Sequence, residues 1–455
     1  MHIHILGICG TLMGSIALLA KEAGHKVSGM DQNVYPPMST QLESAGIQFT
    51  APYSAAIPTS ADLVIMGNAG LARGNPAVEA VLNQRIRYVS GAEWLGRYLL
   101  SDRQVIAVAG THGKTTTTSM IAWILEQAGM RPGFLIGGIP ANFDQSARFG
   151  DDPFFVIEAD EYDTSFFDRQ SKFLHYFPRT VVVNNLEYDH ADIFPDLESI
   201  QNQFHLLMRR IPADGQVIYP IVDTHVKEVI DMGCWSEQVT ISGADADIDA
   251  EHVKADGSAF TVKINKTPRG NIQWSLTGMY NVHNALAAIA AARHAGVTPE
   301  AACTALCAFK GVKRRMELIY SKGSLKVYDD FAHHPTAIAG ALAGLRAHAG
   351  TEKILVVIDP ASHTMRLGTH AQNLNAAVTN ADYILWHQPD NIRWDMARYL
   401  QGDNKEIIGS VDDMIDRCEW LIDSIGVNHL VIMSNGGFGG FHRRLIERLQ
   451  PQAHS

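Results

Sequence analysis

The feature that most constrains the fold is a glycine turn near residue 110, between a strand pattern and a helix pattern. Residues 105–109 are apolar, and residues 114–128 are expected to form a helix. The turn and the first helical residues read Gly110-Thr111-His112-Gly113-Lys114-Thr115-Thr116. A strand, a glycine turn and a helix in this order begin a βαβ unit, so the pattern predicts an α/β fold with a parallel sheet.

The same order occurs twice more along the chain. Residues 2–6, a glycine-rich turn and a helix over 11–23 open the chain, and strands are expected again at 325–328, 353–358, 381–386 and 429–433. A polar stretch over 244–270 alternates like short antiparallel strands. We therefore predict three domains, over 1–100, 101–316 and 317–455: two Rossmann-like domains flank a central domain of the P-loop ATPase type, which carries a small antiparallel appendage.

Composition limits the partners of the chain. Of the 455 residues, 48 are Asp or Glu and 37 are Lys or Arg, which gives a net charge of -11. This excess of acidic residues does not favour binding to nucleic acid or to an anionic membrane surface. Any phosphate must therefore be bound by a local cluster of groups. No export signal and no apolar run of membrane-spanning length is present, and the expected location is the cytoplasm.

The turn at 110–116 is typical of a phosphate-binding loop. Its glycines allow backbone N–H groups to face phosphate oxygens, and the helix that follows adds its positive N-terminal end. Lys114 can reach the β- and γ-phosphates of a nucleotide, and the Thr115 hydroxyl can bind Mg²⁺. The alternative is an ordinary glycine turn between strand and helix.

Two acidic segments follow strands of the predicted central sheet, at 158–163 and 184–190. The carboxyl ends of parallel strands face the ligand crevice, and nucleotide triphosphate chemistry needs a metal to neutralise charge. We expect Glu158 and His190, with Thr115, to bind magnesium. The alternative is that these residues are solvated turn residues.

Further candidates lie near the junction of the second and third predicted domains. Asn281 and Asn284 lie three residues apart at a helix start, where they either contact an adenine edge or cap the helix. Arg315, in a basic segment, can turn toward a γ-phosphate or lie on a solvated face. The adjacent His333 and His334 precede a proline and can form a capped turn.

The first glycine turn reads Gly7-Ile8-Cys9-Gly10-Thr11-Leu12-Met13-Gly14, and Asp31 follows the next strand. The glycine spacing differs from that of the dinucleotide fingerprint, so it suits a diphosphate without specifying a nicotinamide cofactor. The alternative is tight packing of helix against strand.

Taken in order along the whole chain, these segments resemble the Mur ligase family. The family pattern comprises the early glycine turn, Gly-Thr-x-Gly-Lys-Thr-Thr, a Glu-Ala-Asp-Glu strand end, Asn-x-x-x-Asp-His, Gly-x-x-Asn-x-x-Asn-Ala, an Arg before Met, and Asp-Asp-aromatic-x-His-His-Pro. Tyr280 stands where the family often has His, and Ala361 stands where relatives tend to be basic.

The resemblance implies a role for each matching residue. Residues 110–116 would bind ATP, with Lys114 on its phosphates, Asn281 and Asn284 on adenine, Arg315 on the γ-phosphate and Asp330 on the ribose. Thr115 and Glu158 would bind one Mg²⁺ and His190 a second. As a separate hypothesis, a base near the closed domain interface, His333 or His334, assists the amine. The uridine diphosphate of a UDP-sugar would lie against the first turn, at Gly7, Gly10, Thr11, Gly14 and Asp31.

The implied reaction is ATP-dependent amide formation through an acyl phosphate. Three segments, over 31–40, 185–194 and 434–440, are most similar to family members that join the tripeptide L-Ala-γ-D-Glu-meso-diaminopimelate to the lactyl carboxylate of UDP-N-acetylmuramate, in peptidoglycan recycling. Addition of L-alanine to the same sugar is the close alternative. A nicotinamide-dependent oxidoreductase and a non-catalytic nucleotide-binding module are the alternatives from other classes.

Overall fold

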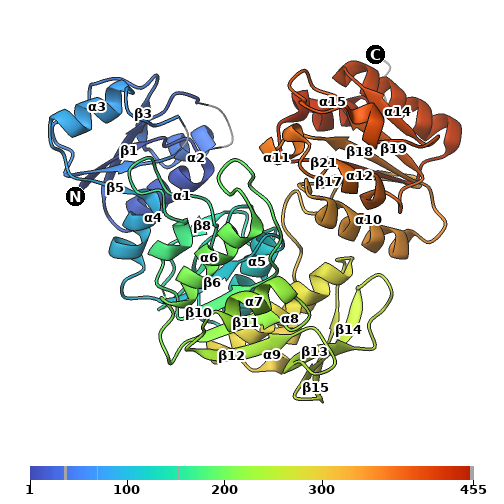
Figure 1. Cartoon of the computed structure of the whole chain (residues 1–455), viewed down its shortest axis with the longest axis horizontal. Coiled ribbons are helices and arrows are strands. Elements are labelled where there is room, and N and C mark those ends of the chain that lie inside the picture. Colours follow the sequence, from blue (N-terminus) through green and yellow to red (C-terminus); the bar gives the residue numbers. More distant parts are fainter. Residues whose placement is uncertain (35–37, 69, 152, 451–455) are drawn as a thin grey trace.

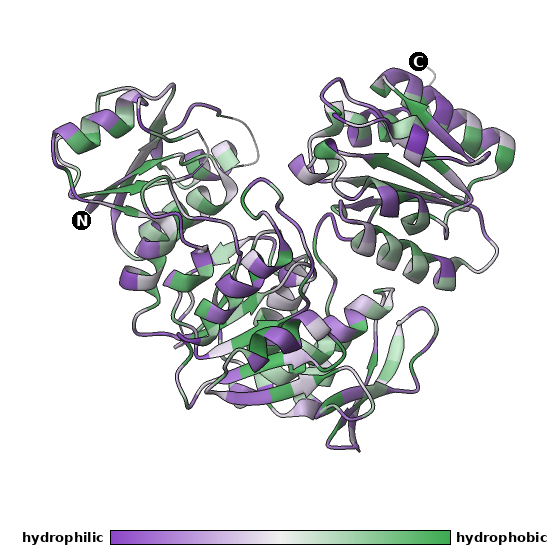
Figure 2. Ribbon diagram, in the orientation of Figure 1, coloured by the Kyte–Doolittle hydropathy of each residue, from purple (hydrophilic) through white to green (hydrophobic). Residues whose placement is uncertain are grey.

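The chain folds around three separate β-sheets, one for each predicted domain. The computed structural model describes residues 1–34, 38–68, 70–151 and 153–450. Figure 1 shows the central domain below, with the N-terminal and C-terminal domains on either side above it. Figure 2 shows that apolar residues are concentrated in the strands and on helix faces turned toward them. The predicted α/β fold class is confirmed.

The N-terminal sheet has five parallel strands in the order β3-β2-β1-β4-β5. Its strands are β1 (His2–Leu6), β2 (Lys26–Met30), β3 (Gln48–Thr50), β4 (Leu63–Met66) and β5 (Tyr88–Ser90). Its helices are α1 (Thr11–Glu22), α2 (Met38–Ser44), α3 (Pro76–Asn83) and α4 (Gly91–Trp94). The strand order reverses at β1, so the first glycine turn lies at the switch point where ligands of such sheets bind.

The N-terminal and central domains share one apolar cluster. It extends from Ile3 and Ile16 in the first domain through Trp94 to Phe155 and Phe204 in the second. The helical segment that closes the first domain is split: α4 is followed by a π-helical turn, η1 (Leu95–Leu99). This turn packs against the 3-10 helix η2 (Lys172–His175), where a side chain at Gly96 would overlap the His175 carbonyl.

The central sheet has ten strands in the order β15-β14-β13-β12-β11-β10-β6-β9-β7-β8. The parallel strands are β6 (Gln104–Ala109), β7 (Gly133–Leu135), β9 (Phe154–Glu158), β10 (Thr180–Val183), β11 (Gln216–Pro220) and β12 (Glu237–Ile241). Strand β6 lies between β9 and β10. The glycine turn after β6 is therefore adjacent to the ends of both strands that precede the acidic segments.

Helices cover both faces of the central sheet. One apolar cluster packs α5 (Lys114–Gln127), α8 (Met279–His294) and α9 (Pro299–Cys307) on one face. The other face carries α6 (Leu197–Met208) and α7 (Thr224–Asp231), and it belongs to the cluster shared with the N-terminal domain. Packing of α5 against α8 places the phosphate-loop pattern next to Asn281 and Asn284.

The predicted antiparallel appendage is an extension of the central sheet. Strands β13 (Ile248–Glu251), β14 (Ala259–Ile264) and β15 (Thr267–Gln273) pair antiparallel with one another, and β13 joins β12 through a single parallel bridge. At the opposite edge, β8 (Ala147–Arg148) pairs antiparallel with β7.

The C-terminal sheet has six strands in the order β16-β17-β21-β18-β19-β20, parallel except for β16. Its strands are β16 (Glu317–Lys322), β17 (Leu325–Asp330), β18 (Ile354–Asp359), β19 (Tyr383–His387), β20 (Lys405–Ile408) and β21 (His429–Ser434). The α-helices are α10 (Pro335–Ala349), α11 (His363–Leu367), α12 (Ala371–Ala377), α13 (Met396–Tyr399), α14 (Val411–Ile425) and α15 (Phe441–Leu449), with a 3-10 turn η3 (Phe438–Gly440) before α15.

The two apolar clusters of the C-terminal sheet consist only of residues of that domain. The described polar contacts with the central domain include a hydrogen bond from Thr364 Oγ1 to Asp189 Oδ1 at 3.2 Å and an ion pair of His348 with Asp256 at 3.2 Å. Within the described residues, no helix combines the length and apolar character needed to cross a membrane.

Candidate active site

The glycine turn after β6 has a backbone that only glycine fits. Gly110 and Gly113 have φ angles of +119° and +80°. A Cβ at Gly110 would lie 2.8 Å from the Asn185 carbonyl oxygen, and one at Gly113 would lie 2.5 Å from Asn284 Oδ1. The turn leads directly into α5, whose first four N–H groups have no partner within the helix. This arrangement suits an anionic ligand.

Lys114 lies at the start of α5 and is almost fully enclosed. Its Nζ donates to the Gly110 carbonyl at 2.7 Å and to Glu161 Oε2 at 3.0 Å. Burial alone would lower the pKa of the ammonium, but Glu161, Asp160 and Glu158 together raise it above its usual value. The side chain is therefore a fixed positive charge at the base of the turn.

Thr115 and Glu158 meet as the sequence predicts. The Thr115 hydroxyl donates to Glu158 Oε1 at 3.0 Å, and the other carboxylate oxygen accepts from the Gly137 N–H at 2.7 Å. Arg315 Nη2 donates to Thr115 Oγ1 at 3.4 Å, which brings the predicted γ-phosphate ligand to the same point. Burial raises the pKa of the Glu158 carboxyl, although Lys114 opposes the shift.

His190 joins Asp160 and Glu161 in a second group. One ligand atom from each of the three lies within 4.8 Å of the others, and His190 Nε2 pairs with Glu161 Oε1 at 3.0 Å. Lys172 Nζ donates to Asp160 Oδ2 at 3.0 Å. Burial opposes ionisation of Asp160, but Lys172 and Lys114 hold its pKa below the usual range. This donor set fits a divalent cation that prefers oxygen ligands.

The predicted adenine ligands are buried beside the turn and bonded to their neighbours. Asn281 Nδ2 donates to the Thr277 carbonyl at 2.8 Å. Asn184 Nδ2, which the sequence analysis did not single out, donates to the His112 carbonyl at 3.2 Å and lies 3.4 Å from Asn284 Oδ1. These amides brace the turn from two elements that are distant in sequence.

The C-terminal domain contributes residues from the end of β17 and the start of α10. Both carboxylate oxygens of Asp330 accept backbone N–H groups, from Ala332 at 2.7 Å and from Met316 at 2.8 Å. His333 Nδ1 bonds the Phe331 carbonyl at 3.0 Å. That carbonyl can only accept, so Nδ1 carries the proton and Nε2 has a free lone pair.

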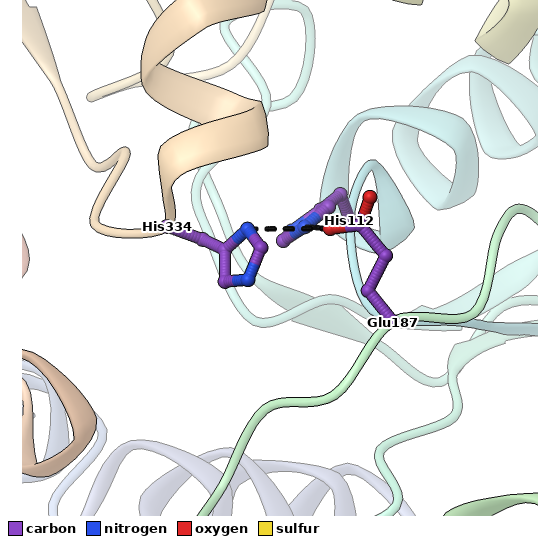
Figure 3. Close-up of side chains that lie close together, drawn as sticks. All are labelled: His112, Glu187 and His334. Carbon is purple, nitrogen blue, oxygen red and sulfur yellow. Dashed lines mark hydrogen bonds and ion pairs between the residues drawn. The ribbon is translucent and has the colours of Figure 1, made fainter. Parts of the chain in front are cut away.

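His334 lies closer to the phosphate turn than the sequence alone indicates. Its Nδ1 is 3.3 Å from Glu187 Oε2, and the same oxygen is 3.0 Å from His112 Nε2 (Figure 3). Burial, together with nearby His112 and His370, lowers the pKa of His334 to about 3. Burial alone would raise the pKa of Glu187, but its contacts with His112, His334 and Thr336 lower it to about 2.

These groups line one cavity of about 540 Å³ between the central and C-terminal domains. The predicted site residues that line it are Thr111, His112, Gly113, Lys114, Thr115, Thr116, Glu158, His190, Asn281, Asn284, Arg315, Asp330, His333 and His334. Asp160, Asn184, Glu187 and Asp189 also line it without having been singled out. The sequence feature that could have identified them is their position directly after β9 and β10, where strand ends face the cavity.

The first glycine turn lies outside this cavity, in the N-terminal domain. Gly7 has a φ angle of +82°, and Asp31 Oδ2 accepts the Cys9 N–H at 2.7 Å. Thr11 begins α1 directly after Gly10. Gly14 faces Met38, whose side chain a Cβ there would overlap, so this glycine has a packing role. The quoted segment over 31–40 includes residues 35–37, which lie outside the described part of the chain.

Comparison with known families covers nearly the whole chain. The sequence models for the Mur ligase family catalytic domain, the Mur ligase middle domain and the Mur ligase glutamate ligase domain match residues 2–103, 108–292 and 314–434. The chain belongs to the Mur ligase family. The family matches follow the same order as the three sheets.

Relatives of this Mur ligase extend over its full length. It is 49% identical over 459 residues to the UDP-N-acetylmuramate–L-alanyl-γ-D-glutamyl-meso-2,6-diaminoheptandioate ligase of Escherichia coli strain K12, with 100% of both chains covered. It is 33% identical to the UDP-N-acetylmuramate–L-alanine ligase of Chlorobium phaeobacteroides, over 84% of this chain and 81% of the relative. The crystal structure of a murein peptide ligase from Psychrobacter arcticus superimposes with a TM-score of 0.75 at 44% identity, covering 100% of both chains.

Proposed function

We propose that this Mur ligase uses ATP to join L-alanyl-γ-D-glutamyl-meso-diaminopimelate to the lactyl carboxylate of UDP-N-acetylmuramate, in the recycling of peptidoglycan. The observation that carries the proposal is the cavity in which a phosphate-binding turn, two carboxylate groups and a histidine of the C-terminal domain meet. The tripeptide is favoured over L-alanine because identity to the E. coli tripeptide ligase is 49% over the full length, against 33% over 84% of the chain for an alanine ligase.

The residues around the turn fit a magnesium nucleotide. Residues 110–116 would bind the phosphates, Arg315 the γ-phosphate, Asn281 and Asn284 the adenine, and Asp330 the ribose. Thr115 and Glu158 would hold one Mg²⁺, and His190, with Asp160 and Glu161, a second. Magnesium supplies charge neutralisation when bound.

The reaction needs an activated carboxylate, because hydroxide is a poor leaving group for an attacking amine. The lactyl carboxylate attacks the γ-phosphorus of ATP, and ADP leaves. The peptide amine then attacks the acyl phosphate carbon, forms the C–N bond and expels inorganic phosphate. Lys114 and Arg315 position and stabilise the transferring phosphoryl group.

A proton must leave the attacking amine. His333 is the better placed of the two adjacent histidines, because its Nδ1–H is committed to the Phe331 carbonyl and leaves Nε2 as an acceptor. Burial lowers the pKa of His333, so the ring is neutral at neutral pH. His334 instead contacts Glu187 and the N–H of Thr336, which suits a positioning role.

We assign the N-terminal domain, over 1–100, to the uridine diphosphate, with Gly7, Gly10, Thr11 and Asp31 against it. The central domain, over 101–316, takes ATP, and the C-terminal domain, over 317–455, closes over the site with the peptide. The first turn supports this assignment because it lies at the switch point of a parallel sheet. Both nucleotide substrates place the reaction in the cytoplasm.

The test offers the protein ATP, Mg²⁺ and UDP-N-acetylmuramate with either the tripeptide or L-alanine. Phosphate release is followed continuously, and the product mass identifies the amide formed. We expect turnover with the tripeptide and little with L-alanine. Turnover with L-alanine alone would assign the chain to the other substrate, and phosphate release with neither would contradict the ligase proposal.

A further inference from the structure

A group of three ligand-type side chains lies between the central and C-terminal domains, apart from the proposed magnesium ligands. His112 comes from the phosphate turn, Glu187 from the segment after β10, and His334 from the residue before α10. One ligand atom from each lies within 4.8 Å of the other two. In Figure 3 the two rings and the carboxylate point toward one another across the domain junction.

Two of the three separations between these atoms are close to those of a tetrahedral metal site, and the third is below 4.8 Å. His112 Nε2 lies 3.0 Å from Glu187 Oε2, and His334 Nδ1 lies 3.3 Å from the same oxygen. Ligand atoms around tetrahedral Zn²⁺, with bonds of about 2.0–2.1 Å, are separated by roughly 3.3 Å. An ion can therefore enter with little movement of either domain.

The Nδ1 atom of His334 faces two groups with opposite requirements. Its Nδ1 faces both the Thr336 N–H, at 3.3 Å, and the Glu187 carboxylate. An unprotonated Nδ1 can accept the Thr336 N–H, but its lone pair then repels the Glu187 carboxylate. A protonated Nδ1 can donate to the carboxylate, but it can no longer accept the N–H. The ring is more than nine-tenths buried, and its Nε2 also lacks a partner. A cation bound by the Nδ1 lone pair and the carboxylate removes the repulsion between these two groups, and the Thr336 N–H then turns to another acceptor.

The donor set selects the type of ion. Two imidazoles and one carboxylate favour Zn²⁺ over Mg²⁺, which prefers oxygen ligands and retains its water. The neighbouring group of Asp160, Glu161 and His190 has the opposite balance, with two carboxylates and one imidazole. We propose that His112, Glu187 and His334 form a Zn²⁺ site that joins the phosphate turn to the C-terminal domain.

Such an ion has a structural consequence. Two of its ligands belong to the central domain and one to the C-terminal domain, so binding links the two across the cavity. Bound Zn²⁺ holds the domains together and restricts access of substrates to the phosphate turn. Its fourth position remains open to water, as in zinc sites with three protein ligands.

The experiment measures Zn²⁺ binding to the full chain by equilibrium dialysis and metal analysis, in millimolar Mg²⁺ so that oxygen-rich sites are occupied. We expect one tightly held Zn²⁺ per chain. His334→Ala and, separately, His112→Ala should weaken it by more than about 100-fold, since even outer-shell partners of a metal are worth roughly 10- to 100-fold. His333→Ala is the matched control, because it removes the adjacent histidine and should leave Zn²⁺ affinity unchanged.

A second readout reports domain linkage without activity. Zn²⁺ should decrease the radius of gyration of the wild type in small-angle scattering and should have no effect on His334→Ala. Co²⁺ should give the intense visible absorption of a tetrahedral complex in the wild type only. Circular dichroism checks that each variant is folded. Binding that survives both ligand variants, or is lost only in His190→Ala, would overturn the proposal.

Discussion

Two glycine turns in this chain share a backbone plan and differ in the side chains around them. Each follows the first strand of a parallel sheet and leads into a helix. In the first turn, Asp31 of the same domain accepts the Cys9 N–H, and Gly14 packs against Met38. In the second, Lys114, Thr115 and Glu158 surround the start of the helix.

The difference shows that the strand–turn–helix scaffold supplies a binding position, while chemistry depends on what neighbouring strands add. The second turn lies between β9 and β10, whose ends carry acidic residues and asparagines. In the first, the neighbouring strands β2 and β4 contribute one nearby carboxylate, and it is already bonded to the backbone. Changes at the second turn should therefore affect kcat, and changes at the first should affect KM or stability.

The largest effect is expected for Lys114→Met. Loss of the charge that stabilises the transferring phosphoryl group should reduce kcat by roughly 10²- to 10³-fold, the range for one preorganised donor. It also leaves the buried Glu161 carboxylate with His190 as its remaining ion-pair partner, so the melting temperature should fall. Lys114→Arg is the control, because it keeps the charge and should retain the fold while remaining impaired in phosphate release. Wild-type kcat in Lys114→Met would contradict the role given to the second turn.

A smaller loss of activity, with a gain in stability, is expected for Glu158→Gln. The amide should raise the Mg²⁺ concentration needed for half-maximal activity. Because burial raises the folded pKa of Glu158 above its unfolded value, the charged carboxylate destabilises the fold once the pH exceeds the unfolded pKa. The variant should therefore melt higher than wild type at neutral pH, and the difference should shrink as the pH falls toward about 4.3, the usual Glu pKa, and be absent below it. Equal melting temperatures at neutral pH would contradict this account.

At the first turn, Asp31→Ala should raise KM for UDP-N-acetylmuramate by about tenfold, the effect of losing one hydrogen bond to a charged group. The carboxylate holds the N–H groups of Cys9 and Asn33, so its loss loosens the turn. Steady-state kinetics with varied UDP-sugar and varied ATP separate the two sites. A drop in kcat with KM unchanged would break the distinction between the turns.

The smallest effect on activity is expected for Gly14→Ala. The added methyl group would overlap the Met38 side chain, and overpacking of this kind costs about 1–3 kcal/mol. Denaturant unfolding should show the loss, and Met38→Ala in the same chain should recover part of it. If KM for the UDP-sugar rises instead, with stability unchanged, Gly14 contacts substrate and does not serve packing.

The parts of the fold that depend on local pattern could be predicted from sequence. Strand β1 has the predicted limits, and α5 begins at Lys114 as expected. The π-helical turn after α4 could not be predicted from a local pattern, because it lies where Gly96 packs closely on His175, a residue distant in sequence. The sequence also did not predict that the antiparallel strands β13–β15 extend the central sheet at β12, because hydrophobic periodicity does not specify which edge strand they join.

The site followed the same rule. Thr115 and Glu158 lie in contact because strand ends of a parallel sheet converge, and their role as metal ligands stays a prediction. The contact of His112 with Glu187 and His334 depends on how two domains meet, which no local motif records. Asn184, directly after β10, meets Asn284 because α8 packs on β10, a contact within the central domain that no local motif records either.

The separate apolar clusters of the C-terminal sheet imply that this domain has its own melting behaviour. The first two domains, which share a cluster, should melt as a single cooperative block, and calorimetry should resolve two transitions. A nucleotide that binds across the cavity would decrease the difference between the two melting temperatures. The heat-capacity trace would then report how strongly ligand binding couples otherwise autonomous parts of the chain.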